Sequence, residues 1–242
     1  MSIITAAVKK IFDKAGYEIR LKSLNHVSPG FETMSAGLER LKQKGINPAR
    51  VIDVGAAQGT WTAKAIQYWP GSRYDLIEPL TEQQEILEQL KSAHSNINYH
   101  LAVAGEQAGE VLLNISEDLD GSGIYGGQAG NARKVPVIPI DQVAGSESCL
   151  IKLDTHGYEV PILKGATKTL MNTQALIIEV YGFRISPTCL LFHELTAYLE
   201  TLGFRLLDIV DIMRRPKDNA FWQADAIYIR KDHAIFLDNN YA

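Results

Sequence analysis

Short apolar runs of strand length alternate along the chain with longer segments whose apolar residues recur at helical spacing. The apolar runs predict five strands, at Arg50–Val54, Tyr74–Ile77, Asn98–Val103, Cys149–Leu153 and Ala175–Val180. Each run is almost uninterrupted, as expected for parallel strands that are buried on both faces. The alternation therefore predicts an α/β fold built on a largely parallel sheet.

Helical spacing predicts the segments that connect these strands. The expected helices are Phe31–Lys44, Thr60–Tyr68, Glu82–His94, Glu159–Leu170 and Pro187–Thr201. Pro161 is compatible with the fourth helix, because a proline in the first turn removes only an amide that would be unpaired anyway.

Two parts of the chain depart from the alternation. Glu110–Ile115 and Lys134–Ile140 have strand patterns around a glycine-rich loop, so we expect an inserted hairpin or flap, whose tip around Tyr125 could close over a ligand. Phe204–Val210 and Asp225–Arg230 are joined without a helical segment, so we expect them to pair antiparallel. An ordinary dinucleotide-binding domain does not end in this way.

Length and composition narrow the classes of protein that remain. The 242 residues suit one large domain, which we place at residues 46–242, after a helical appendage at residues 1–45. With 24 Lys plus Arg against 28 Asp plus Glu, the chain has no basic surface of the kind that binds nucleic acid. No apolar run is long enough to cross a membrane. Two cysteines outside any metal-binding spacing indicate reduced thiols and a cytoplasmic location.

The sharpest local motif is VIDVGAAQGTW, which predicts a buried strand, a tight turn and a helix. Small residues at Gly55, Ala57 and Gly59 let a ligand approach the backbone, and the helix start offers free N–H groups. The nicotinamide fingerprint would need glycine at positions 55, 57 and 60, but positions 57 and 60 are Ala and Thr. With Asp53, the loop instead fits D-x-G-x-[GA]-x-G, a pattern of enzymes that bind the amino-acid tail of S-adenosylmethionine. A tight turn without a ligand is the alternative.

The ends of the next two strands add candidates for a nucleoside site. Glu78 ends the second strand, where a carboxylate can accept hydrogen bonds from both hydroxyls of a ribose. Ala102, between Leu101 and Val103 at the end of the third strand, would line an adenine. A surface glutamate and core packing are the respective alternatives.

A second group of polar residues follows the later strands. Asp154 and His156 lie just after the predicted strand Cys149–Leu153, and Glu179 and Tyr181 end the next one. The carboxyl ends of parallel strands meet at one edge, so these side chains should converge beside the glycine loop. An imidazole can act as a general base towards a hydroxyl near pH 7. The carboxylates could instead orient loops or, with the imidazole, hold a divalent ion, which we do not favour.

Taken together, these motifs resemble the FkbM-type methyltransferases, a family of class I S-adenosylmethionine-dependent O-methyltransferases. The segments that carry the resemblance are VIDVGAAQGTW, LIEPL, AVAGEQAGEVLL, VPVIPIDQV and IKLDTHGYEVPILKGA, of which the last is similar to the family signature IKxDxEGxExxxLKGA. The resemblance covers Gly45 to Arg230 and implies a Rossmann-like, seven-stranded, mostly parallel sheet with an antiparallel C-terminal strand and helices on both faces. Two positions depart from it: His156 replaces the usual Glu, and Leu101 replaces a frequent Asn.

We therefore expect S-adenosylmethionine as the cofactor and transfer of its methyl group to a hydroxyl of a small molecule such as a sugar or polyketide. The cofactor-binding candidates are Asp53, Gly55, Ala57, Gly59, Glu78 and Ala102, and the catalytic candidates are His156, Asp154 and Glu179. A nicotinamide-dependent oxidoreductase and a non-catalytic cofactor-binding module are the alternatives. The motifs indicate neither the acceptor nor the oligomeric state.

Overall fold

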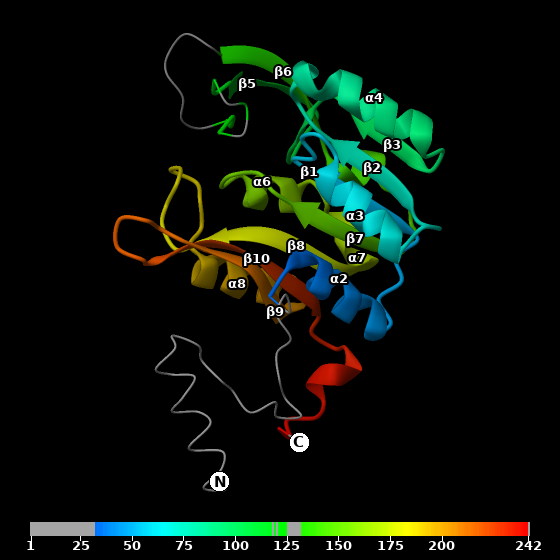
Figure 1. Cartoon of the computed structure of the whole chain (residues 1–242), viewed down its shortest axis with the longest axis vertical. Helices are drawn as coiled ribbons and strands as arrows, with labels where there is room; N and C mark the ends of the chain where they lie inside the picture. The colour runs from blue at the N-terminus through cyan, green and yellow to red at the C-terminus, as the bar shows by residue number, and fades with distance from the viewer. Residues whose placement is uncertain (1–31, 118, 120, 125–131, 242) are drawn as a thin grey trace, which may run out of the picture. The chain divides into compact units, whose positions relative to one another are not determined.

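The computed structural model describes residues 32–117, 119, 121–124 and 132–241, whose main element is a seven-stranded sheet (Figure 1). Its strands, in spatial order, are β3 (Ile97–His100), β2 (Arg73–Ile77), β1 (Arg50–Val54), β7 (Cys149–Leu153), β8 (Thr173–Tyr181), β10 (Phe221–Arg230) and β9 (Phe204–Arg214). The first five are parallel, whereas β10 pairs antiparallel with both β8 and β9. The predicted parallel sheet with an antiparallel C-terminal pair is confirmed.

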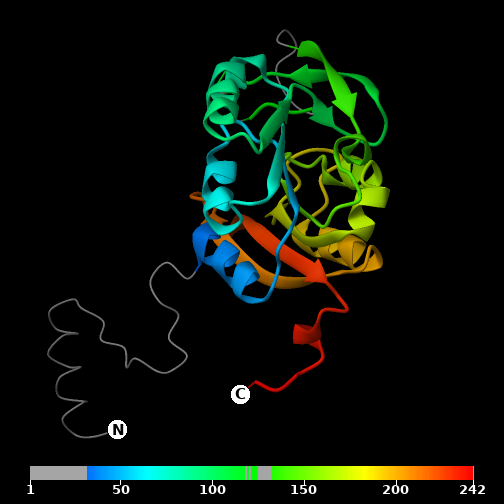
Figure 2. The same ribbon diagram turned by 90° about the vertical axis from the view of Figure 1, so that its right-hand side faces the viewer.

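Helices cover both faces of this sheet, as Figure 2 shows. They are α2 (Met34–Gln43), α3 (Thr60–Tyr68), α4 (Gln84–Ala93), α5 (Ile140–Val143), α6 (Glu159–Lys164), α7 (Thr167–Met171) and α8 (Phe192–Thr201), with short 3-10 turns at η1 (Thr81–Gln83) and η2 (Ala234–Phe236). Successive strand residues point to opposite faces. Val51 and Ile177 pack with residues of α2, α3 and α4, whereas Ile52 and Ile178 pack with residues of α6, α7 and α8.

Helix α2 belongs to the core of the described unit. The Thr33 hydroxyl accepts a hydrogen bond from the Ala36 N–H and caps the start of the helix. Met34, Leu38 and Leu41 recur at helical spacing and are buried against the sheet. The predicted appendage at 1–45 thus contributes its residues 34–43 to this core, while residues 1–31 lie outside the described residues and their helix stays a prediction.

A second, three-stranded sheet has the order β4-β6-β5, with β4 at Val103–Ala104, β5 at Gly109–Asn114 and β6 at Ala132–Ile138. Strands β5 and β6 pair antiparallel, as the sequence predicts. Leu113, Val135, Val103 and Leu80 form an apolar cluster of their own beneath it. The predicted flap tip at Tyr125 lies outside the described residues.

Three sequence predictions are wrong in detail. The strand expected at Asn98–Val103 ends at His100, because the Ala102 N–H bonds back to the His100 carbonyl and sends the chain into β4 of the other sheet. The helix expected at Glu159–Leu170 is split into α6 and α7 around Gly165, where a Cβ would clash with the Gly105 carbonyl oxygen.

The helix expected at Pro187–Thr201 begins only at Phe192. The Leu191 N–H donates to the Glu194 carboxylate and so fixes the start of the helix there. Within the part of the chain that the structure describes, we find no helix with the length and apolar character that a membrane crossing requires.

Candidate active site

A cavity of about 270 Å³ lies at the carboxyl edge of the parallel strands. The ends of β1 and β2 and the loops after β1, β2, β3 and β7, with Glu179 of β8, form its floor and sides, and residues of the smaller sheet and its loop complete it. Its lining residues are Val54, Gly55, Ala57, Ile77, Glu78, Pro79, Leu80, Gln83, Ala102, Val103, Ala104, Leu113, Leu119, Ser122, Gly123, Ile124, Asp154, Thr155, His156, Tyr158 and Glu179.

The glycine loop after β1 has a left-handed backbone at Gly55, Ala57 and Gly59, with φ of 72°, 45° and 74°. This conformation is readily adopted by glycine and strained for other residues. A Cβ at Gly55 would clash with the Asp154 carbonyl oxygen, so the loop lies directly against the end of β7. Gly55 and Ala57 face the cavity, whereas Gly59 lies against Leu90 of α4 and does not line it.

Glu78 ties the glycine loop to the end of β2. Its two carboxylate oxygens accept hydrogen bonds from the Ala57 N–H (2.8 Å) and the Leu80 N–H (2.9 Å). Burial raises the pKa of Glu78 above its ordinary value, although both N–H groups favour the charged form. Each carboxylate oxygen keeps a further lone pair, so Glu78 can still accept a hydroxyl of a ligand in the cavity.

Asp53 does not reach the cavity, contrary to the role that its motif suggests. It shares a face of β1 with Val51 and is fully buried, where its Oδ2 accepts a hydrogen bond from the Thr62 hydroxyl of α3 (2.7 Å). Its Oδ1 lies 3.7 Å from the Lys152 Nζ. Burial raises the pKa of Asp53, and Lys152 opposes this rise. Asp53 therefore supports the glycine loop from below.

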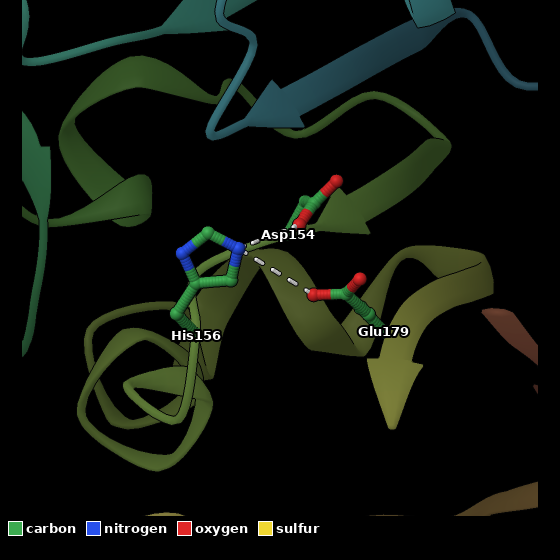
Figure 3. A group of neighbouring side chains, drawn as sticks. All are labelled: Asp154, His156 and Glu179. Atoms are coloured by element: carbon green, nitrogen blue, oxygen red, sulfur yellow. Dashed lines mark ion pairs between the residues drawn. The ribbon is translucent and has the colours of Figure 1, made fainter. Parts of the chain in front are cut away.

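The predicted convergence of Asp154, His156 and Glu179 is present (Figure 3). The His156 Nε2 lies 3.8 Å from the Asp154 Oδ1 and 3.8 Å from the Glu179 Oε2. All three side chains line the cavity. His156 thus stands between two carboxylates that come from the ends of adjacent parallel strands.

A buried glutamate shapes the turn that carries His156. The backbone is left-handed at His156, with φ 52°, and at Gly157, with φ 94°. The Glu159 Oε1 accepts hydrogen bonds from the Gly157 N–H (2.9 Å) and from the Thr155 hydroxyl (3.2 Å). These bonds hold a strained turn that directs the imidazole into the cavity.

Lys152 supplies the charge that keeps Asp154 ionised. Its Nζ donates to the Asp154 Oδ2 at 2.9 Å, and only 6% of the Lys152 side chain is exposed. Burial alone would raise the pKa of Asp154, but the ammonium outweighs burial and lowers it. Burial alone would lower the pKa of Lys152, but the carboxylates of Asp53 and Asp154 raise it. The lysine and Asp154 therefore form a charged pair beneath the cavity.

The pKa of Glu179 is displaced in the opposite direction to that of Asp154. Burial, followed by the negative charge of Asp154, raises the pKa of Glu179 from 4.5 to about 8. The Tyr181 hydroxyl donates to its Oε2, and the Gln223 amide donates to its Oε1. Neighbouring carboxyl groups with pKa values displaced in opposite directions are typical of sites that move protons.

Sequence reasoning assigned no role to several residues that complete the site. Lys152 is part of the quoted segment IKLDTHGYEVPILKGA and lies two positions before Asp154. In an extended chain this spacing places both side chains on the same side, so it could have identified Lys152. Gln223 and Asp225 approach Glu179 only through the antiparallel register of β10 with β8, which apolar patterns do not specify. Burial raises the pKa of Asp225 to about 6.

The cluster could also serve as a donor set for a divalent ion. Asp154, His156 and Glu179 each offer one ligand atom, and these atoms lie within 4.8 Å of one another. However, Asp154 already accepts from Lys152, and Glu179 accepts from Tyr181 and Gln223. Both carboxylates are thus satisfied by protein donors without an ion.

Residues 53–206, more than half of the chain, match the family described as Methyltransferase FkbM domain. No curated protein matches the sequence. Among solved structures, the N-methyltransferase NodS from Bradyrhizobium japonicum WM9 is similar with a TM-score of 0.51 and 11% identity, over 85% of this chain and 98% of that chain. The 1,6-didemethyltoxoflavin-N1-methyltransferase from Burkholderia thailandensis has a TM-score of 0.49 and 12% identity, over 96% and 92% of the two chains.

Proposed function

The chain belongs to the FkbM methyltransferase family, and we propose that it moves the methyl group of S-adenosylmethionine to a hydroxyl of a small molecule. Its fold is the Rossmann-like fold of class I methyltransferases. Membership in this family argues against the nicotinamide-dependent oxidoreductase considered from the sequence. One observation carries the proposal: the glycine loop and the Asp154–His156–Glu179 cluster line the same cavity.

The cavity residues fit S-adenosylmethionine from end to end. Backbone groups at Gly55 and Ala57 would meet the methionine end. The Glu78 carboxylate would accept the ribose hydroxyls, and Ala102 would contact the adenine. Asp53 and Gly59 lie outside the lining, so we revise their predicted contacts to support of the loop.

The bound donor supplies an electrophilic methyl carbon on a positively charged sulfur. In the transfer, the acceptor oxygen would form a bond to this carbon while the carbon–sulfur bond broke and left its electron pair on sulfur. The hydroxyl proton passes to the His156 Nε2, which acts as the general base. Asp154, whose carboxylate Lys152 keeps ionised and whose Oδ1 lies 3.8 Å from that nitrogen, stabilises the imidazolium that results.

The acceptor would enter beside the smaller sheet. Leu113 and Ile124 give this wall of the cavity an apolar surface, and Ser122 gives it a hydroxyl. A cavity of about 270 Å³ with these walls suits a small hydroxylated molecule. Nucleic acid is not the proposed partner, because the chain has a net charge of −4. Cys149 and Cys189 are buried free thiols, which suits the proposed cytoplasmic location.

Thermal denaturation with the donor tests this proposal. S-adenosylmethionine at about 1 mM should raise the melting temperature, because a ligand that binds only the folded state stabilises it by mass action. Gly55→Arg should abolish the rise, since its Cβ would clash with the Asp154 carbonyl oxygen and displace the loop that contacts the donor. Gly71→Arg is the matched control, because a Cβ at Gly71 meets nothing within 4 Å.

A methyl-transfer assay then separates an enzyme from a binding module. Formation of S-adenosylhomocysteine is measured across a panel of hydroxylated sugars and polyketides. Turnover with at least one acceptor, and its loss in His156→Ala, is the expected result. A protein whose melting temperature does not respond to the donor would contradict the proposal.

A further inference from the structure

Four basic side chains, which we call the basic patch, lie in the loop after β8 and at the tip of the β9–β10 hairpin: Arg184, Arg214, Arg215 and Lys217. We propose that this patch binds a phosphate group of the acceptor while the hydroxyl to be methylated lies in the cavity. The class of acceptor is therefore a phosphorylated sugar. This inference rests on the proposed function and names the substrate class of the same site.

The loop after β8 packs directly against the turn that carries His156. The Thr188 hydroxyl of this loop donates to the Gly157 carbonyl at 3.1 Å. A Cβ at Gly157 would lie only 2.8 Å from the Cys189 Cβ, so the loop and the turn are in close contact. Arg184 is part of the same loop and donates to the Cys189 carbonyl at 2.8 Å. The loop therefore joins the basic patch to the proposed general base.

The tip of the hairpin packs against this loop as well. The Gly182 N–H donates to the Trp222 carbonyl at 2.8 Å. The ring of Phe183 stacks on that of Trp222, with 5.6 Å between the ring centroids, and the Arg215 guanidinium lies 3.9 Å from the Phe183 centroid. Figure 1 shows the loop in yellow and the hairpin in orange at the same end of the sheet. The stack thus brings together cations from two segments that lie far apart in the sequence.

The basic patch begins a short distance from the cavity. Tyr181 and Gln223 both donate to Glu179 in the lining, and each directly adjoins a residue that joins the loop to the hairpin. Arg184 follows Glu179 by 184 − 179 = 5 positions, which span at most about 17 Å of extended chain. An arginine side chain covers several ångströms of that distance. An acceptor made of a sugar ring and its phosphates therefore reaches from the cavity to the patch.

The cavity is too small to enclose the donor and the whole acceptor together. Its volume is about 270 Å³, whereas pockets that hold a single ligand typically measure about 300–1,000 Å³. When the donor is in place, the part of the acceptor away from the reacting hydroxyl lies outside the cavity. The basic patch is a charged surface beside the cavity that can hold this part.

Two members of the patch have carboxylate partners. The Arg184 Nη2 donates to the Glu194 Oε1 at 2.6 Å, and the Arg215 Nε donates to the Asp218 Oδ1 at 3.1 Å. The Arg184 side chain is 50% exposed and the Arg215 side chain 30%. A guanidinium has five N–H donors, so each of these arginines can also donate to a second acceptor.

The other two members, Arg214 and Lys217, have no carboxylate within ion-pair distance in the part of the chain that the structure describes. Both are exposed, and Arg214 donates to the Asn219 carbonyl at 3.1 Å. The patch thus keeps 4 − 2 = 2 positive charges beyond its ion pairs, on a chain whose net charge is −4. A guanidinium matches the oxygens of a phosphate in pairs and an ammonium adds a point charge, so this excess suits a phosphate.

Calorimetry with two matched pairs of sugars tests the proposal, on the whole chain saturated with S-adenosylhomocysteine. The pairs are glucose with its anomeric phosphate, and methyl glucoside with uridine diphosphate glucose. We expect the phosphorylated sugar of a pair to bind about tenfold or more tightly than the neutral one. Arg214→Gln combined with Lys217→Gln should reduce this ratio to about threefold or less. Lys42→Gln combined with Lys168→Gln, which removes the same charge from exposed positions of α2 and α7, should leave the ratio unchanged.

The outcomes separate this inference from the proposed function. If neither phosphorylated sugar binds more tightly than its neutral partner, or if the double variant in the patch keeps the full ratio, the acceptor class is wrong while the methyltransferase assignment stands. If S-adenosylhomocysteine itself does not bind, the proposed function fails. If the double variant does not fold, Lys217→Gln alone replaces it, because this side chain is exposed, and a smaller ratio than in the wild type is expected.

Discussion

The titration of Glu179 should make the stability of the protein depend on pH, and Glu179→Gln should remove that dependence. Burial, with Asp154 as the second cause, raises the pKa of Glu179 from 4.5 to about 8. The unfolded chain loses this proton near pH 4.5, whereas the folded protein keeps it up to about pH 8. Stability from this group is therefore complete below pH 4.5 and is lost as the pH rises to about 8.

The size of the effect follows from the two pKa values. The interval from 4.5 to about 8 covers about 3.5 pH units, and each unit corresponds to about 1.4 kcal/mol. The wild type should thus lose on the order of 5 kcal/mol of unfolding free energy across this range relative to the variant. Glutamine has nearly the same shape as glutamate and does not titrate, so the variant isolates the proton.

Urea denaturation at about pH 5 and about pH 8.5 measures both free energies of unfolding. The advantage of Glu179→Gln over the wild type should grow between the two conditions. Glu85→Gln, on the exposed surface of α4, should track the wild type at both. A difference between Glu179→Gln and the wild type that stays constant within about 1 kcal/mol would refute the reasoning.

Three further predictions concern the same edge of the sheet. His156→Gly should stabilise the fold by about 1 kcal/mol in thermal denaturation, because φ 52° suits glycine, yet slow methyl transfer by about 10²-fold or more; undiminished turnover would rule out His156 as the base. Lys152→Met should destabilise the protein by about 3–5 kcal/mol in urea, since Asp53 and Asp154 lose their cation; a loss below about 1 kcal/mol would contradict the charged pair. Excess EDTA should leave the transfer rate unchanged, and a loss that Mg²⁺ restores would instead make Asp154, His156 and Glu179 metal ligands.

The strands that form the floor of the site could be predicted closely from the sequence. β1 and β7 have the predicted bounds, because each is a buried run that stops at a turn. β9 continues to Arg214, past the predicted end at Val210, because its outer residues are exposed while their backbone still pairs with β10. Apolar pattern marks where a strand is buried, whereas backbone hydrogen bonds decide where it ends.

The candidate residues divide in the same way. The positions of Gly55 and Glu78 at the cavity could be predicted, because both residues lie at the ends of parallel strands. The position of Asp53 outside the lining of the cavity could not be predicted, because in a strand buried on both faces the pattern does not say which face adjoins the cavity. The partners of Glu179 depend on pairing between strands that lie far apart in the sequence, such as the register of Gln223 with Tyr181.

The pairing of β1 with β7 also affects the order in which the protein folds during synthesis. Arg50 pairs with Cys149, and 149 − 50 gives a sequence separation of 99 between these partners. Closing so long a stretch of chain is entropically expensive and slow, so β1, β2 and β3 can associate well before β7 joins them. During synthesis the glycine loop emerges long before β7 and the cavity residues that follow it. A nascent chain that stops short of β7 would carry the loop and Glu78 yet lack the edge that makes them a binding site.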